Sequence, residues 1–162
     1  MEPKKDILKT ALLEAVSQAL ENMAFEEVDL VDETSMSRVE VGGNLWAILP
    51  IVTPLSGEMI LSLSPECARR ITENIYGTLE DGQLEKGADL DAVAEILNTI
   101  AGRFVHALVP SNQSFDFGLP KTGKGAVPVI PPQVITSVSI DAGGHIVTAI
   151  VVGEDFRNLV NP

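Results

Sequence analysis

The longest helical pattern in the chain is ADLDAVAEILNTIAGRFVHALV, residues 88–109. Its apolar side chains recur three and four positions apart, which is the spacing of a helix with one buried face. The members of this face are Leu90, Val93, Ala94, Leu97, Ala101, Phe104 and Leu108. Pro110 cannot continue the helix, because its ring removes the backbone N–H and clashes with the preceding turn. We therefore expect a long helix over residues 88–109 that covers a core with one face.

Two more helices are expected upstream of this one. Residues 6–24 repeat the same spacing, with apolar positions at Leu8, Ala11, Leu12, Ala15, Val16, Ala19 and Met23. A shorter helix is predicted over residues 65–77. Ser64 is a good N-cap, Pro65 suits the first helical position, and Gly77 is a common C-terminal stop.

Strand patterns occupy most of the remaining chain. Residues 45–52 and 58–63 indicate one hairpin, joined by a turn that contains Pro54 and Gly57. Residues 134–140 and 145–152 indicate a second, and their connection Asp141-Ala142-Gly143-Gly144 is the strongest hairpin signal in the chain. Shorter strands are expected within residues 25–32 and 115–117. Pro50 cannot donate to a ladder and predicts an edge or a bulge, and residues 77–87 and 118–132 are expected to be connectors.

The two parts of the chain follow the same order of elements. Each has a long amphipathic helix, a strand and a hairpin, over about residues 6–63 and 88–152, with the helix at 65–77 between them. An offset of 81 positions places Glu14 on Glu95 and Ser17 on Asn98. We therefore predict a single α+β domain over residues 1–162, built from duplicated α-β-β-β halves. The halves form one mostly antiparallel sheet, with the two long helices on one face.

Composition excludes several classes of protein. The chain has 162 residues, a net charge of −12 and one cysteine. One cysteine makes neither an internal disulfide nor a thiolate zinc site, and a strongly acidic chain lacks the basic surface that nucleic acids require. No apolar run approaches the ~20 residues of a membrane span, and the N-terminus carries no signal-peptide pattern. We expect a cytoplasmic protein without membrane insertion.

Polar side chains form a stripe beside the apolar face of the 88–109 helix. Asp91, Glu95, Asn98 and Gly102 lie within it at helical spacing. A carboxylate can pair with a cation from a partner, and a carboxamide can orient a water molecule, although it is a poor general base. Glycine inside a helix costs about 1 kcal/mol of stability relative to alanine. Its presence at position 102 therefore indicates a place where another molecule approaches the helix backbone closely. The alternative is an ordinary solvated helix face.

This stripe carries a family resemblance. Asp91-x-x-x-Glu95-x-x-Asn98, continued by Thr99-Ile100-Ala101-Gly102 and later by Pro120, resembles the signature of the CheC/CheX chemotaxis phosphatases. The end of the first helix, Leu20-Glu21-Asn22-Met23-Ala24, is similar to that of CheX-type sequences. The likeness extends over about residues 7–152, and it indicates a CheX-like protein with a single Glu-x-x-Asn site.

The resemblance implies a substrate and a role for each residue. The substrate would be a phosphorylated response regulator of the CheY type, which would itself carry the Mg²⁺, so that this chain binds no cofactor. Asn98 would orient the attacking water and Glu95 would pair with a lysine of the regulator. Asp91, Gly102 and Pro120 would support docking or helix geometry. Because CheX-like relatives pair through sheet edges and helices, the resemblance also implies a homodimer.

The sequence departs from the family pattern in two places. Twenty-one residues separate Asn98 from Pro120, one fewer than the family spacing. In the first half the positions that match the pair are Glu14 and Ser17. Two-site relatives carry asparagine in place of this serine, so the first-half site is expected to be degenerate and inactive.

Other candidate sites are weaker. Residues 118–125, GLPKTGKG, come close to a phosphate-binding P-loop, but Gly125 replaces the Ser or Thr that holds Mg²⁺ and the prolines that follow forbid the required helix. Lys121 and Lys124 are then either a mobile basic loop that contacts an acidic partner or a solvated connector. His106 and His145 have no companions at metal-ligand spacing. Cys67 is expected to be a buried small hydrophobe.

The sequence therefore leaves three alternative functions. The first is hydrolysis of the aspartyl phosphate of a CheY-like regulator by Glu95 and Asn98. The second is a non-catalytic module of the same fold that binds a regulator or forms a dimeric scaffold. The third, a small-molecule-binding domain, would require an enclosed apolar pocket with convergent polar groups.

Overall fold

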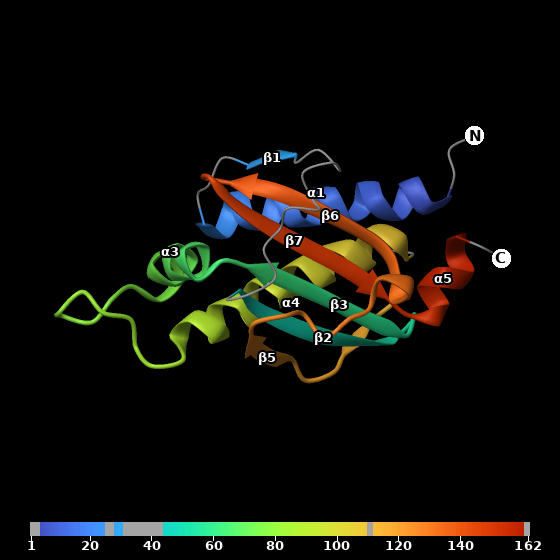
Figure 1. Cartoon of the computed structure of the whole chain (residues 1–162). Coiled ribbons are helices and arrows are strands. Elements are labelled where there is room, and N and C mark those ends of the chain that lie inside the picture. Colours follow the sequence, from blue (N-terminus) through green and yellow to red (C-terminus); the bar gives the residue numbers. More distant parts are fainter. Residues whose placement is uncertain (1–3, 25–27, 31–43, 110–111, 161–162) are drawn as a thin grey trace.

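The computed structural model describes residues 4–24, 28–30, 44–109 and 112–160, which form helices on a mostly antiparallel sheet (Figure 1). The helices are α1 (Lys4–Ala24), α3 (Pro65–Tyr76), α4 (Ala88–Leu108) and α5 (Glu154–Val160), with a short 3₁₀ turn at Pro131–Gln133. The strands are β1 (Val28–Leu30), β2 (Leu45–Thr53), β3 (Gly57–Leu63), β4 (Asp116–Phe117), β5 (Lys121–Lys124), β6 (Val134–Ala142) and β7 (His145–Val152). The predicted α+β class is confirmed.

The sheet interleaves the two parts of the chain. Its order is β1-β6-β7-β3-β2-β4, with β5 also paired to β2, and the pairings among the described strands are antiparallel. The two hairpins meet at the centre, where Leu61 lies opposite Ala149. Strand β1 pairs with β6 of the second hairpin, while β4 pairs with β2 of the first. This order is symmetric about the central pair, and the division of the sequence into two repeats stays a prediction.

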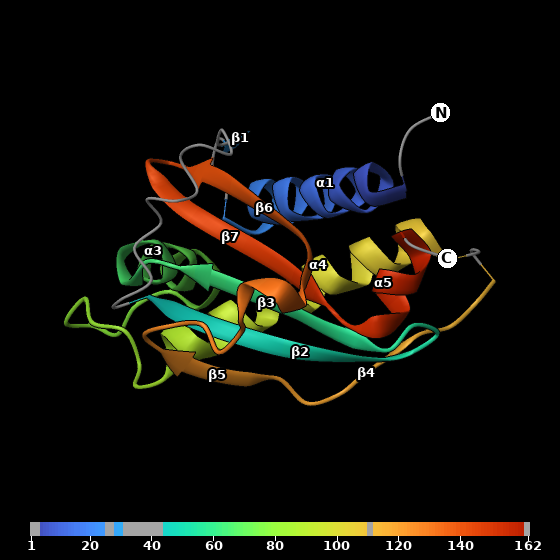
Figure 2. The same cartoon turned by 45° about the vertical axis from the view of Figure 1, so that its right-hand side comes forward.

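Helices α1 and α4 lie side by side on one face of the sheet, as predicted (Figure 2). Alternate residues of each strand point into this layer because successive side chains of a strand face opposite sides; on β2 they are Leu45, Ala47, Leu49 and Ile51, all buried. From α4, Leu97, Ala101 and Phe104 enter the same core and are fully buried. Figure 2 also shows α5 at one end of this layer, where Phe156 packs on Phe104 with ring centroids 5.9 Å apart.

The ends of α3 follow from its capping residues. Ser64 Oγ accepts a hydrogen bond from the backbone N–H of Cys67 at 3.1 Å, and Pro65 opens the helix. Gly77 stops it at a φ of +76°, and its N–H donates to the carbonyl of Glu73. The predicted boundaries are therefore confirmed, and they leave Tyr76 as the last residue of α3.

The connector predicted over residues 118–132 is wrong for residues 121–124, which form the edge strand β5 against the first half of β2. Strand β2 has neighbours on both sides, and Pro50 lies between its pairing with β5 and its pairing with β4, where its carbonyl accepts a hydrogen bond from the N–H of Gly118 at 2.8 Å. The register shift against β4 falls between Ile51 and Thr53 rather than at Pro50. Gly123 then lies on Trp46, and a Cβ there would overlap the indole ring. Lys-Thr-Gly-Lys has no apolar alternation because this strand lies at the rim of the sheet.

Other boundaries differ from expectation at the ends of elements. Helix α5 was not predicted, because seven residues are too few for a clear helical period. Helix α4 ends at Leu108, and Pro110 lies outside the described residues. Of the strand predicted within residues 25–32, the structure describes Val28–Leu30, and the other residues lie outside the described part of the chain. The strand expected over 115–117 is limited to Asp116–Phe117.

The opposite face of the sheet carries a smaller apolar cluster. Ile48, Ile60 and Val152 form it, and Val127 and Val129 cover it from the segment that crosses β2 and β3 after β5 (Figure 1). None of the described helices is both long and apolar enough to cross a membrane. A cytoplasmic location and a homodimer stay predictions.

Candidate functional site

The polar stripe of α4 faces solvent. Asp91, Glu95 and Asn98 are exposed, and Gly102 is half-buried. The opposite face of the helix fixes its rotation about its own axis, because it is buried in the core. The buried residues of this stretch are Val93, Ile96, Leu97 and Ile100. At 1.5 Å of rise per residue, Glu95 and Asn98 lie less than one turn apart and project on the same side. The structure thus brings the predicted pair together on a rigid support.

Glu95 has a neighbour that the sequence did not indicate. The hydroxyl of Tyr76 donates a hydrogen bond to Glu95 Oε2 at 2.8 Å, from the last residue of α3 to the middle of α4. This hydrogen bond raises the pKa of Tyr76 above its ordinary value of 10.0, with further contributions from burial and from the carboxylates of Glu95 and Asp91. The phenol therefore stays protonated at neutral pH and remains a donor.

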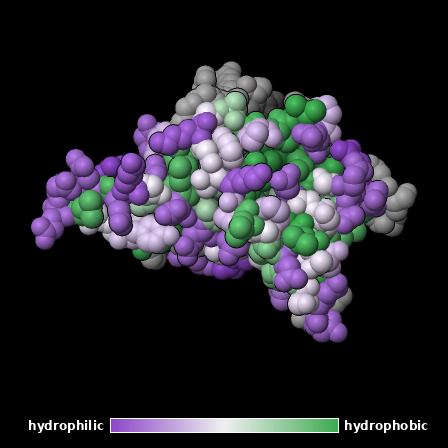
Figure 3. Space-filling model, turned by 90° about the horizontal axis from the view of Figure 1, so that it is seen from below, coloured by the Kyte–Doolittle hydropathy of each residue, from purple (hydrophilic) through white to green (hydrophobic). Residues whose placement is uncertain are grey.

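A pocket of about 310 Å³ lies beside this contact, between the end of α3 and the start of α4. Tyr76 and Asp91 belong to its lining, together with Leu79 and Glu85 from the connector of residues 77–87. Figure 3 shows this connector as an arm of mostly hydrophilic side chains that projects from the molecule. Arg69 of α3 donates a hydrogen bond to the carbonyl of Gly82, the middle residue of this connector, at 2.9 Å.

The surface over Gly102 is open. A Cβ placed on this residue would find no heavy atom within 4 Å apart from its own helix backbone and chain neighbours. Among the residues that the structure describes, neither a positive φ nor a packing contact requires glycine at this position. That another molecule approaches at Gly102 stays a prediction.

The remaining predicted site residues lie on other elements. Glu14 is exposed and Ser17 half-buried on α1, which is linked to α4 by a hydrogen bond of 3.1 Å from Arg103 to Gln18. Pro120 is exposed in the turn between β4 and β5. The first-half pair and Pro120 thus come from elements other than α4.

The other candidates do not form sites in the described part of the chain. No group of three or more His, Cys, Asp and Glu side chains gathers there at metal-binding distance. His106 is exposed, His145 Nδ1 lies 3.4 Å from Ser64 Oγ, and Cys67 is buried, as predicted. Residues 121–124 form a strand, which is incompatible with a phosphate-binding P-loop.

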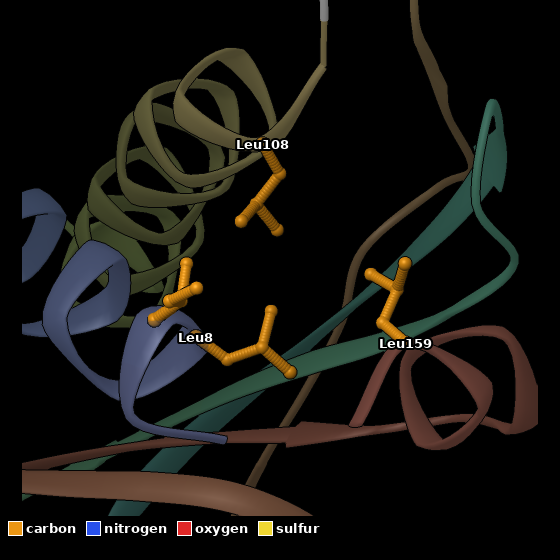
Figure 4. A pocket seen from close by; sticks show the side chains of 4 residues that line it. Leu8, Leu108 and Leu159 are labelled. Atoms are coloured by element: carbon orange, nitrogen blue, oxygen red, sulfur yellow. The ribbon is translucent and has the colours of Figure 1, made fainter. Parts of the chain in front are cut away.

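A second pocket lies at the far end of α4. It has a volume of about 240 Å³ and is lined by Ile7, Leu8, Leu108 and Leu159 (Figure 4). Leu108 is 13 residues from Glu95, about 20 Å along the helix axis. These four aliphatic side chains offer no polar group that would orient a ligand, so the pocket gives no support to a small-molecule site.

Comparison with solved structures places this fold among the CheC-like and CheX proteins. CheX from Vibrio vulnificus superposes with a TM-score of 0.69 at 19% identity, and the match covers 90% of this chain and 95% of that one. The chain in the crystal structure of the CheX-CheY-BeF3-Mg complex from Borrelia burgdorferi matches with a TM-score of 0.58 at 16% identity, over 88% and 95% of the two chains. A CheC-like protein from Shewanella oneidensis gives 0.62 at 14% identity, over 91% and 98%.

The sequence assigns the family. Residues 46–142 match the family "Chemotaxis phosphatase CheX", and this range includes Glu95, Asn98 and Pro120. The CheY-P phosphatase CheX of Thermotoga maritima is 25% identical over 115 residues, which are 71% of this chain and 74% of that protein. The chain belongs to the CheX family of chemotaxis phosphatases, and the predicted resemblance is confirmed.

Proposed function

We propose that this chain hydrolyses the aspartyl phosphate of a CheY-like response regulator, and that Glu95 and Asn98 carry out this reaction. The observation behind the proposal is the exposed pair on α4, held outward by a helix whose opposite face is buried. The pair can enter the active site of another protein without any rearrangement of this fold. The CheY-P phosphatase activity named for the Thermotoga relative and the CheY chain in the Borrelia complex support this choice of substrate.

The chemistry assigned to Asn98 is the orientation of water. The water oxygen attacks phosphorus in line, the bond from phosphorus to the aspartyl oxygen breaks, and inorganic phosphate leaves while the regulator regains its carboxylate. The carboxamide accepts a hydrogen bond from the water and holds it in the attacking position. Because an amide is a poor base, Asn98 contributes to catalysis by positioning the water. Positioning of this kind lowers the activation free energy of hydrolysis.

Glu95 is assigned to docking. Its carboxylate pairs with a lysine beside the aspartyl phosphate of the regulator, which fixes the approach of α4 and aligns Asn98. Mg²⁺ belongs to the active site of the regulator in this proposal, where it neutralises charge on the phosphoryl oxygens. Asp91 and Gly102 extend the contact along the same stripe.

The test measures phosphate release from a phosphorylated CheY-like regulator in the presence of Mg²⁺. We expect Asn98→Ala to lower kcat about 100-fold, the effect of removing one group aimed at the reacting atoms. Glu95→Ala should raise KM about tenfold through loss of the ion pair. Asn22→Ala and Glu14→Ala are matched controls, because both residues are exposed on α1 and lie off the stripe.

Three results decide the proposal. Acceleration by the wild type and by both controls, with loss in Asn98→Ala, supports it. Unchanged turnover in Asn98→Ala contradicts the assignment of the water-orienting group. Binding of the regulator without acceleration by the wild type replaces hydrolysis with the non-catalytic binding module.

A further inference from the structure

We infer that Tyr76 is a positioning residue for Glu95: its hydroxyl holds the carboxylate in the orientation that receives the cation of the regulator. The inference rests on the proposed function, because it concerns how α4 meets its partner. Tyr76 lies outside the Asp91-x-x-x-Glu95-x-x-Asn98 stripe and comes from a different helix.

The geometry gives Tyr76 a fixed starting point. It is the last residue of α3, whose buried face includes Ile71 and Thr72 and whose ends are set by Ser64 and Gly77. The phenol then reaches α4 and donates to Glu95 Oε2 at 2.8 Å. A glutamate on an exposed helix face would otherwise sample several rotamers, because three single bonds lie between its carboxylate and the backbone.

The contact leaves the carboxylate able to bind a cation. A carboxylate has about four lone-pair directions on its two oxygens, and one phenol occupies one of them. A lysine ammonium would bind at Glu95 Oε1 or at the second direction of Oε2. The neighbouring carboxylates raise the pKa of Tyr76, so the donor persists at the pH of the reaction.

Ordering a side chain in advance lowers the entropy lost on binding. Loss of the hydroxyl should therefore weaken binding of the regulator about three- to tenfold, the size of one side-chain ordering cost. The chemical step depends on Asn98, so kcat should change less than about twofold. A rise in KM with a nearly constant kcat is the signature of a group that acts on docking alone.

Tyr76 is also half exposed, so its ring could contact the regulator directly. A double-mutant cycle separates the two roles. If Tyr76 acts only through Glu95, Tyr76→Phe has no effect once Glu95 is alanine. If the phenol contacts the regulator itself, the effect of Tyr76→Phe is the same in both backgrounds.

The experiment measures four proteins: wild type, Tyr76→Phe, Glu95→Ala and the double variant. For each, we would determine Kd for the regulator activated with beryllofluoride and Mg²⁺, and KM and kcat for the phosphorylated regulator. Thr78→Val is the matched control, since it removes a hydroxyl from the lining of the same pocket. We expect a three- to tenfold rise in Kd and KM for Tyr76→Phe alone, with the control unchanged.

A second measurement tests the contact without any partner. Tyr76 is the only tyrosine of the chain, so the ultraviolet absorbance of tyrosinate reports its pKa directly. Glu95→Gln should lower this pKa, because it removes the negative charge beside the phenol. An unchanged pKa, or an equal effect of Tyr76→Phe with and without Glu95, would overturn the inference alone. Absence of any regulator binding by the wild type would instead refute the proposed function.

Discussion

Gly102→Ala should make the free protein more stable and a poorer partner for the regulator. Gly102 lies at the fifteenth position of the 21-residue helix α4, well inside both ends. The new methyl group meets no atom of the described residues within 4 Å beyond its own helix, so no steric cost from them opposes the gain in helix propensity. That gain is about 1 kcal/mol, which corresponds to a rise in Tm of about 2–4 °C for a chain of this size.

The same methyl group stands on the stripe that carries Glu95 and Asn98. If the regulator approaches the backbone there, the methyl group holds it away, and turnover should fall about tenfold at subsaturating regulator, because a displacement of about 1 Å is costly in a positioned reaction. Thermal unfolding and phosphate release on the same preparation provide the two readouts. Thr10→Ala is the control, since it raises helix propensity by about 0.5 kcal/mol at an exposed position of α1, outside the stripe of α4. A lower Tm for Gly102→Ala would refute the claim that the added methyl group meets no steric hindrance. Unchanged turnover would refute the claim that the regulator approaches the backbone at Gly102.

Three further predictions concern stability. Phe156→Ala should cost about 3–5 kcal/mol, because a fully buried ring is lost from its contact with Phe104; chemical denaturation measures this, and a cost below 1 kcal/mol would show that α5 contributes little to the core. Ser64→Ala should cost about 1 kcal/mol through loss of the N-cap of α3, with Thr as the conservative replacement that restores the midpoint of the same denaturation curve. The free energy of unfolding should be larger for the wild type than for Tyr76→Phe below about pH 10, where the tyrosine of the unfolded chain is protonated. This difference should disappear as the pH rises through the raised pKa of Tyr76 in the folded protein. A difference that persists at higher pH would contradict the hydrogen bond.

The sequence predicts most of the fold because its signals are local. The long apolar period of α4, the Ser64-Pro65 start of α3 and the Gly143-Gly144 turn each act over a few residues, and each is found as expected. The exposed stripe on α4 follows from the same period, since the positions that are not apolar must face outward. The pair Glu95 and Asn98 could therefore be proposed without a structure.

The contact between Tyr76 and Glu95 could not be predicted in this way. It depends on how α3 packs against α4, which no spacing within either helix specifies. Strand β5 was missed for a related reason, because its four residues are set by the partner strand β2 and by the interruption at Pro50 rather than by their own polarity. Local sequence patterns do not predict features that depend on contacts between distant segments of the chain.

The interleaved sheet makes the two parts of the chain depend on each other for folding. Helix α1 lies over β6 of the second hairpin, α4 lies over β2 of the first, and the leading strand of each part completes the hairpin of the other. Buried side chains of α1, α4 and both hairpins belong to one apolar cluster, so the chain should fold and unfold as one cooperative unit. The first part of the chain thus supports the exposed stripe of the second, because α1 and β2 both pack against α4.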